Sequence, residues 1–236
     1  MSFTLGIITA RGGSKGIKNK NIMPINKKPL IHYTIEAAQR SQTLDDLILS
    51  TDSQKIIDCA QLAGLNETRL RPGHLATDQT KSNDVLYYEV NRYQEENNKI
   101  VDNIILLQPT SPLRETTDID DAYKAYQDNN SKTLISCYNA ESVHPQIMYK
   151  KNSDDLLTPF LESGKEIIRR QDTETLYIRN GAIYIMDVQY FLETKKTVCN
   201  SPALYEMPKS RSLNIDSPED LALASFYLNE AEKNII

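Results

Sequence analysis

The feature that most constrains the fold is a regular alternation between apolar runs and segments with helical spacing. Four apolar runs have the length of buried strands: residues 3–10, 46–52, 102–109 and 132–138. Four segments between and after them carry apolar residues at helical spacing: residues 29–41, 53–64, 82–96 and 116–129. Strands and helices that alternate in this way form right-handed crossovers. The pattern therefore predicts an α/β fold with a mostly parallel sheet that helices cover on both faces.

The alternation is interrupted in the second half of the chain. Residues 139–176 are polar, contain Pro145 and Pro159, and show no clean period. We interpret them as an insertion in a single domain that spans residues 1–236. Two readings stay open for this insertion, a surface excursion and a dimerisation arm.

Strand and helix signals return after the insertion. Residues 180–187 are typical of a strand, and another short strand is expected within residues 201–216. Residues 217–233 predict a final helix, with Ser217 as its cap and Pro218 at its first position. The sheet domain therefore continues to the end of this sequence.

Composition excludes several classes of protein. The net charge of −5 argues against a general nucleic-acid or membrane-surface binder. No apolar run approaches the ~20 residues of a membrane span, and no basic segment precedes the first apolar run as in a signal peptide. Cys59, Cys137 and Cys199 show no CxxC spacing, so free thiols are expected. These features favour a cytoplasmic globular protein.

A basic, glycine-rich loop follows the first apolar run directly. It contains four cations and three glycines: Arg11, Lys15, Lys18 and Lys20, with Gly12, Gly13 and Gly16. Exposed backbone amides and nearby cations bind phosphate oxygens, and the spread of these cations suits a polyphosphate. The spacing matches neither G-x-x-x-x-G-K-[ST] nor G-x-G-x-x-G, which disfavours a P-loop ATPase or a dehydrogenase. Taken alone, the loop could also be an exposed basic turn.

Six motifs occur in a fixed order between residues 5 and 228: ARGGSKGIKNKNI, RPGHLATD, LLQPTSPLR, RRQD, NGAIYI and NIDSPEDL. Together they resemble the acylneuraminate cytidylyltransferase family, which makes CMP-sialic acid and related CMP-sugars. The resemblance implies a Rossmann-like fold of the nucleotide-sugar transferase type and a homodimer formed through the insertion. It also implies that CTP and a nine-carbon 2-keto sugar acid, of sialic, legionaminic or pseudaminic type, give the CMP-sugar and pyrophosphate.

The same resemblance implies roles for the opening loop in nucleotidyl transfer. Arg11, Lys20 and Asn21 match residues that hold the triphosphate. A guanidinium and an ammonium group there would neutralise the charge that grows on the leaving pyrophosphate. Lys15 and Lys18 are secondary candidates, because a lysine in a long loop is often only solvated.

The second and third motifs are expected at the nucleoside. Arg71, Thr80 and Ser82 match family positions near cytosine and ribose. Ser82 could equally cap the helix that begins there, as could Asn83. Arg114, in contrast, is interpreted as structural.

The sugar acid is expected to contact residues of the later motifs. Gln108 lies at the end of a predicted strand, where its amide can donate to and accept from sugar hydroxyls. The resemblance places Arg170 as a catalytic residue, either on the sugar carboxylate or near the reacting phosphate, with Gln171 beside it. Asn180 and Tyr184 would line the sugar pocket, although Tyr184 could equally belong to the core.

A metal site is expected at Asp216, with Asn214 on the same side of a predicted alternating strand end. Mg²⁺ prefers hard oxygen ligands, and Mn²⁺ is a possible substitute. The family commonly has Asp-Ile-Asp here, so Asn214 removes one formal charge and predicts weaker metal binding. A second departure is Thr9, where proline is usual, and only a small effect on loop stiffness is expected. No residue in the sequence is evident as a general base.

Two alternatives remain to the leading hypothesis. One is the sister activity on 3-deoxy-octulosonate, whose family shares an ending similar to NIDSPEDL. The lysine-rich, glycine-rich opening loop favours the nine-carbon acids over it. The other is a nucleotide- or sugar-binding relative that has lost turnover, to which only Asn214 points.

Overall fold

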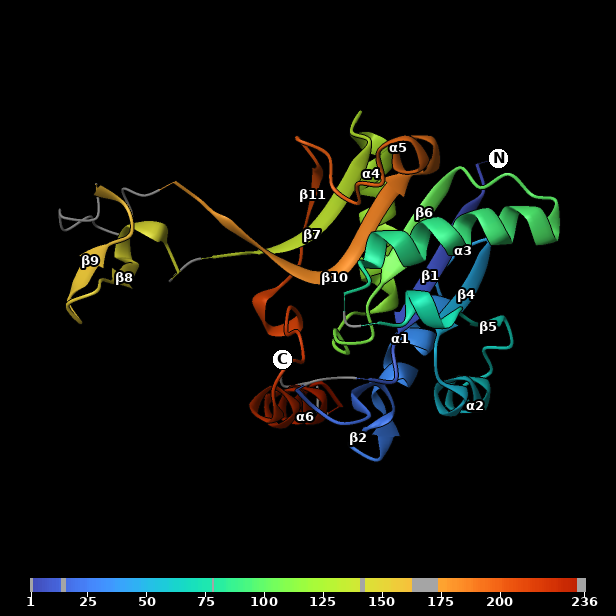
Figure 1. The fold of residues 1–236 in the computed structure, drawn as a ribbon, viewed down its shortest axis with the longest axis horizontal. Coiled ribbons are helices and arrows are strands. Elements are labelled where there is room, and N and C mark those ends of the chain that lie inside the picture. The colour runs from blue at the N-terminus through green and yellow to red at the C-terminus, as the bar shows by residue number, and fades with distance from the viewer. Residues whose placement is uncertain (1, 14–15, 78, 141–142, 163–173, 233–236) are drawn as a thin grey trace.

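The computed structural model describes residues 2–13, 16–77, 79–140, 143–162 and 174–232. A seven-stranded sheet forms its centre (Figure 1). In spatial order its strands are β11 (Ala203–Glu206), β7 (Thr133–Asn139), β10 (Tyr177–Asp187), β6 (Asn103–Leu107), β1 (Thr4–Ala10), β4 (Asp46–Thr51) and β5 (Thr68–Leu70). β10 is antiparallel to both of its neighbours, and the other pairs in this sheet are parallel. The predicted mostly parallel α/β sheet is therefore confirmed.

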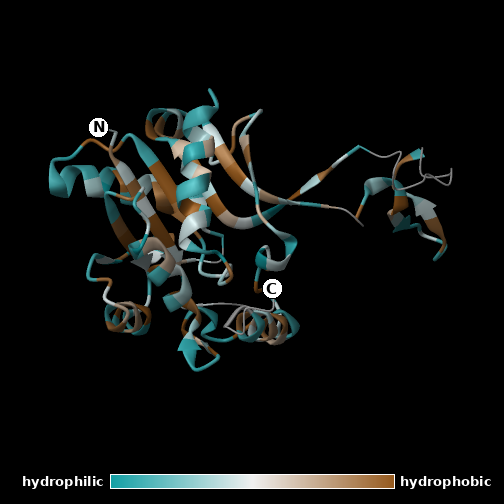
Figure 2. Cartoon of the chain, turned by 180° about the vertical axis from the view of Figure 1, so that it is seen from behind, coloured by the Kyte–Doolittle hydropathy of each residue, from teal (hydrophilic) through white to brown (hydrophobic). Residues whose placement is uncertain are grey.

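Helices cover both faces of this sheet. Against one face lie α1 (Leu30–Gln39), α2 (Gln54–Leu62) and α4 (Thr116–Asp128), and against the other lie α3 (Ser82–Asn97) and α5 (Val188–Thr194). Successive side chains of a strand point to opposite faces. Leu49 therefore packs with α1 and α2, whereas its neighbour Ile48 packs with α3. Figure 2 shows that the strands of the sheet are largely apolar, whereas the helices around them carry both polar and apolar residues.

A smaller apolar cluster joins the opening loop to the end of the chain. It contains Ile17, Leu30, Ile215 and Ala224. The short strands β2 (Pro24–Ile25) and β3 (Lys28–Pro29) pair beside it, next to the final helix α6 (Pro218–Glu232). Burial of these side chains fixes the opening loop against the segment that precedes α6.

The insertion leaves the sheet between β7 and β10 and projects away from it (Figure 1). Its described part carries a hairpin of β8 (Tyr149–Lys151) and β9 (Leu157–Pro159). Several large apolar side chains of this arm are exposed: Val143, Ile147, Met148, Tyr149, Leu156, Leu157, Phe160 and Leu161. Residues 163–173 lie outside the described residues. The arm buries little of its apolar surface within its own chain.

Two local predictions are wrong. Ser82 is the first residue of α3 and not its cap, because the cap position belongs to Lys81, whose side chain makes no capping hydrogen bond. Asn214 and Asp216 lie in an extended loop and not at a strand end. In contrast, Ser217 caps α6 as predicted, since its hydroxyl accepts a hydrogen bond from the Asp220 amide.

Two further observations concern the class of protein. Cys59, Cys137 and Cys199 are free, as predicted. Among the residues that the structure describes, no helix has both the length and the apolar character needed to cross a membrane.

Candidate active site

A cavity of about 590 Å³ opens at the carboxyl ends of β1, β5 and β6. In this fold the strand order reverses around β1, and such reversal points are where open α/β sheets bind ligands. The lining includes nine of the residues that the sequence predicted for the site: Arg11, Lys20, Asn21, Arg71, Thr80, Ser82, Gln108, Asn214 and Asp216. Segments up to two hundred positions apart in the chain therefore meet at one place.

The opening loop is braced from three sides. The amide of Gly12 donates to the Asp52 carboxylate over 2.7 Å, and the Asn21 side chain donates to the carbonyl of Arg11 over 2.9 Å. Gly16 lies so close to Asp216 that a Cβ at this position would be 2.6 Å from the Asp216 carbonyl oxygen. Asn21 therefore shapes the loop through its amide, and Gly16 is required by close backbone approach.

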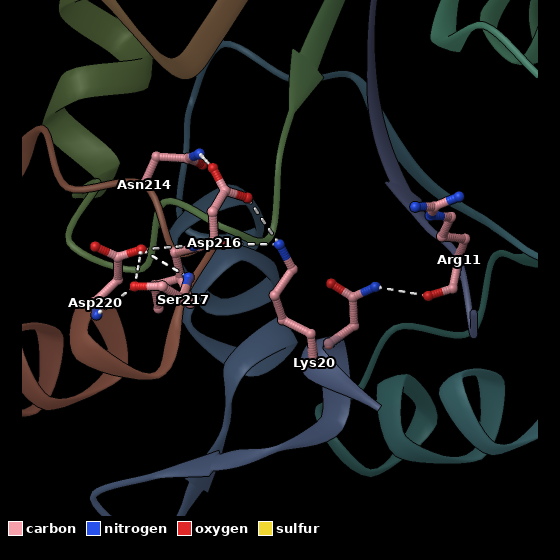
Figure 3. Close-up of polar contacts among 8 residues, drawn as sticks. Arg11, Lys20, Asn214, Asp216, Ser217 and Asp220 are labelled. Atoms are coloured by element: carbon pink, nitrogen blue, oxygen red, sulfur yellow. Dashed lines mark hydrogen bonds and ion pairs between the residues drawn. The ribbon is translucent and has the colours of Figure 1, made fainter. Parts of the chain in front are cut away.

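Lys20 and Asp216 form the charged centre of the cavity (Figure 3). The Lys20 ammonium donates to the Ile215 carbonyl over 2.7 Å and to the Asp216 carboxylate over 3.1 Å. The Asn214 amide donates to the other oxygen of Asp216. Asp216 is therefore oriented by one cation and one amide, both of which face the cavity.

The N-terminal cap of α6 holds the backbone at Asp216. The Asp220 carboxylate accepts hydrogen bonds from the backbone amides of Asp216 and Ser217, over 2.9 and 2.8 Å. Desolvation acts to raise the pKa of Asp220, but these hydrogen bonds outweigh it and hold that pKa below its ordinary value. The capping carboxylate therefore stays ionised and fixes the backbone at Asp216.

Arg71 also lines the cavity. It is 8% exposed, and its guanidinium donates to the carbonyl of Ser50 over 2.6 Å. Burial lowers the pKa of Arg71, against the opposing charges of Asp52 and Glu89. Beside it the Thr80 hydroxyl donates to the His74 carbonyl, and Ser82 is exposed to the cavity. A largely desolvated cation thus faces the space that the opening loop leaves free.

A second cavity of about 390 Å³ adjoins the first, and Gln108 and Asn214 line both. Gly181 has a φ of +77° at a bulge of β10, and a Cβ there would lie 3.0 Å from the Gln108 side chain. Arg114 donates to the carbonyls of Gln108 and Ala182, which ties β6 to this bulge. The structural role predicted for Arg114 agrees with these contacts.

Asn180 and Tyr184 both line this second cavity. The Asn180 side chain is occupied within the protein, since it accepts from Ser136 over 2.6 Å and donates to Ser212 over 2.9 Å. Tyr184 is 8% exposed and also packs in the core beneath α3. Arg170 and Gln171 lie outside the described residues.

Three residues near the site were not singled out from the sequence. Asp52 and Asp220 hold backbone amides, and Arg179 lines the second cavity with its guanidinium 5.8 Å from the Tyr184 ring centre. Asp52 ends the strand motif LSTD and Asp220 falls at the N3 position after Ser217, so both carried a usable signal. Arg179 carried none.

The cavity offers a limited donor set for a metal ion. Among the described residues, no group of three or more His, Cys, Asp or Glu side chains is arranged to hold one. The Asp216 carboxylate and the Asn214 side-chain oxygen are hard ligands on one wall, and that Asn214 oxygen is buried without a hydrogen-bond partner. Because Mg²⁺ usually takes one or two protein oxygens and completes its shell with water and phosphate, these residues fit Mg²⁺.

The described residues thus form an open α/β sheet with a cation-lined cavity at the carboxyl ends of its strands. Residues 5–234 match the family model described as cytidylyltransferase, so the chain belongs to the cytidylyltransferase family.

Named relatives agree with this. The chain is 34% identical over 220 residues to N-acylneuraminate cytidylyltransferase of Escherichia coli O18:K1:H7, covering 93% of this chain and 51% of that protein. It is 31% identical to pseudaminic acid cytidylyltransferase of Campylobacter jejuni, over 93% of this chain and 94% of the relative. It is 32% identical to CMP-N,N'-diacetyllegionaminic acid synthase of the same species, over 97% and 96%. The chain spans about half the length of the Escherichia coli relative, and the resemblance to acylneuraminate cytidylyltransferases is confirmed.

Solved structures support the fold alone. CMP:2-keto-3-deoxy-manno-octonic acid synthetase complexed with CTP is similar with a TM-score of 0.69 at 18% identity, over 98% of this chain and 100% of the other. A 4-diphosphocytidyl-2C-methyl-D-erythritol synthase from Anaerococcus prevotii gives 0.67 at 12% identity, over 97% and 96%. The predicted Rossmann-like transferase fold is therefore confirmed.

Proposed function

We propose that the chain transfers the cytidylyl group of CTP to a nine-carbon 2-keto sugar acid and releases pyrophosphate. The observation that carries this proposal is the meeting of Arg11, Lys20 and Asp216 with the buried Arg71 around one cavity. Relatives named for sialic, pseudaminic and legionaminic acids support the class of sugar. The shape of the sugar pocket decides which of these acids is used.

In this proposal the opening loop binds the triphosphate. Arg11 and Lys20 approach the cavity from two sides (Figure 3), so their charges can neutralise negative charge on the leaving pyrophosphate. Attack by the anomeric hydroxyl on the α-phosphorus forms one P–O bond and breaks the bond to the β-phosphate oxygen. In this mechanism catalysis depends on the positioning of the substrates and on charge stabilisation. We assign Arg170 as a further cation that contributes to this charge stabilisation.

Arg71, Thr80 and Ser82 are assigned to the nucleoside, and the second cavity to the sugar. Gln108 lies where the two cavities meet, which suits an amide that contacts the sugar near the reacting hydroxyl. Tyr184 would provide an apolar wall, since most of its surface is already buried. The internal contacts of Asn180 favour an indirect role, in which it braces the wall of the sugar cavity.

We assign Mg²⁺ to Asp216 and Asn214, with Mn²⁺ as a substitute. When bound, the cation would add positive charge at the phosphate oxygens. The Lys20 ammonium, which already contacts Asp216, would keep the carboxylate turned toward the cavity. Asp220 would hold the backbone beneath it.

We also propose a homodimer that forms through the arm. Exposed apolar residues of a single chain, such as Leu157 at 67% and Ile147 at 64%, would become buried against a second copy. Interfaces of stable dimers are rich in such apolar side chains.

The test is pyrophosphate release from CTP with a panel of sugar acids at saturating Mg²⁺ or Mn²⁺. Turnover with a nine-carbon acid is expected, whereas turnover only with 3-deoxy-octulosonate would transfer the assignment to the sister activity. Protection of the protein against heating by CTP, without turnover of any acid, would identify a binding relative. No protection and no turnover would refute the nucleotide site itself.

A further inference from the structure

Glu89 is a fully buried acid that the proposed reaction does not use. It lies on α3 on the side that faces the sheet, and it is 0% exposed. One carboxylate oxygen accepts a hydrogen bond from the Ser50 hydroxyl over 2.6 Å, and the other has no hydrogen-bond partner. A buried carboxylate with an unsatisfied oxygen costs stability, so its presence calls for a physical reason.

Ser50 connects this acid to the nucleotide cavity. Its hydroxyl donates to Glu89, and its backbone carbonyl accepts the Arg71 guanidinium over 2.6 Å. Ser50 is itself 0% exposed. Glu89, Ser50 and Arg71 therefore form a continuous polar chain that runs from behind the sheet to the cavity wall.

Among the described residues, the neighbouring Arg69 and Arg92 contact a carboxylate, whereas no ion pair is recorded for Arg71. Arg69 pairs with Ser50 in the β4–β5 register, but its guanidinium contacts Glu96 over 2.6 Å. Arg92 also contacts Glu96, over 2.7 Å. Among the described ion pairs neither Glu89 nor Arg71 has a direct partner. Burial has the largest influence on the pKa of each, and each charge also acts on the pKa of the other, with Asp52 acting on Arg71 more strongly than Glu89 does.

We propose that Glu89 is a positioning residue for base recognition, which holds the Arg71 guanidinium in place through Ser50 and through its negative charge. The inference rests on the proposed function, in which Arg71 faces a cytosine base. Cytosine presents acceptors at O2 and N3, whereas N3 of uracil carries a hydrogen. A fixed arginine donor therefore favours cytosine, and a guanidinium that is free to turn does not.

The charge of Glu89 does not stabilise the folded protein at neutral pH. Burial raises the pKa of Glu89, even though the Ser50 hydrogen bond and the charges of Arg92, Arg69 and Arg71 act to lower it. A carboxyl group whose folded-state pKa is raised loses its stabilising contribution as the pH rises through that pKa. At neutral pH, Glu89→Gln is therefore expected to fold with an unchanged or higher melting temperature, because glutamine keeps an acceptor for Ser50 without the charge.

Steady-state kinetics with CTP and UTP test the proposal on the whole chain. For Glu89→Gln we expect the KM for CTP to rise about tenfold, with kcat within about twofold. The ratio of kcat/KM for CTP over UTP should fall by about the same factor. Ser50→Ala should reproduce the direction of the change. Glu95→Gln, on the exposed side of α3, is the matched control and should leave both nucleotides unaffected.

The possible outcomes separate the hypotheses. If Glu89→Gln improves KM equally for CTP and UTP, its charge only repels phosphate and the proposal is overturned. Unchanged kinetics would overturn it as well, as would a large fall in melting temperature with unchanged CTP over UTP selectivity. If the unmodified protein turns over no nucleotide, the proposed function fails, which is a distinct result.

Discussion

The proposed nucleotide half of the site, around the first cavity, and the proposed sugar half, around the second, differ in how completely the described residues of one chain build them. Around the first cavity, hydrogen bonds hold the side chains of Lys20 and Arg71 in place. Hydrogen bonds also hold the backbone of Arg11 and of Asp216. Around the second cavity, the Asn180 amide is occupied internally and Tyr184 is mostly core. The nucleotide half is thus pre-organised, whereas the sugar half offers few free polar groups from the described residues of its own chain.

This difference fits the chemistry of the two proposed substrates. A triphosphate and a pyrimidine are constant, so a rigid set of cations and amides can be built for them. Sugar acids of this class differ in distant substituents, which pocket shape must accommodate. The exposed apolar arm leaves the sheet beside the second cavity, between β7 and β10, and we propose that a second copy completes this half. Four substitutions test this contrast.

Arg11→Ala should have the largest effect of the four substitutions, and it should impair the nucleotide half. Removing a guanidinium aimed at developing phosphate charge costs about 10³-fold in kcat/KM. The melting temperature should change little, since the side chain lines the cavity and is absent from the apolar core. Arg40→Ala removes an exposed arginine of the same size and serves as the control. Equal kinetics for the two variants would remove Arg11 from the site.

Much of the nucleotide half could be predicted from sequence because its signals are local. The loop from Arg11 to Asn21 is continuous in the chain, and its composition alone indicates phosphate binding. The alternation of strands and helices placed this loop at a carboxyl edge, where Gln108 directly follows β6. Ser82 shows the limit of such local interpretation, because its residue type suits a cap, but Ser82 is the first residue of α3 and the cap position falls on Lys81.

The sugar half could not be predicted in the same way because long-range contacts decide it. Asn180 bonds Ser136 and Ser212, at separations of 44 and 32 residues, and no local pattern reports that its amide is occupied. The bulge at Gly181 depends on how β10 meets Gln108. Short elements such as β5 and β8 are held by pairing and have too few residues to show a period.

Gly16→Ala should have the second-largest effect. A new Cβ would meet the Asp216 carbonyl oxygen at 2.6 Å, so either the loop or the Asp216 segment must move. We expect kcat/KM to fall about 100-fold, because a misplacement near 1 Å has an effect of that size. Gly13→Ala is the matched control, since a Cβ there has no heavy atom within 4 Å. Similar losses of kcat/KM in both variants would show that the reduced flexibility of the loop causes the effect, and that the close approach to Asp216 does not.

Leu157→Glu should act on the sugar half alone. A charge in the exposed apolar arm should halve the apparent mass in size-exclusion chromatography, if the arm joins two copies. The KM for the sugar acid should then rise about tenfold, a common size for coupling between sites, while the KM for CTP stays nearly constant. Leu62→Glu, at an 85% exposed position on α2, controls for the added charge. A dimer that survives Leu157→Glu, or a monomer with unchanged sugar KM, would contradict the completed-site interpretation.

Asn214→Asp should have the smallest effect and should sharpen the nucleotide half. The buried Asn214 oxygen lacks a hydrogen-bond partner, and a carboxylate there would give a cation a second formal charge to bind. We expect the Mg²⁺ concentration at half-maximal rate to fall about tenfold, equivalent to ~1.4 kcal/mol of binding free energy. Without metal, two adjacent carboxylates repel, so the melting temperature of the variant should drop and recover as Mg²⁺ is added. An unchanged titration together with an Mg²⁺-independent melting temperature would show that residue 214 is no ligand, and the metal would then depend on Asp216 and the phosphates.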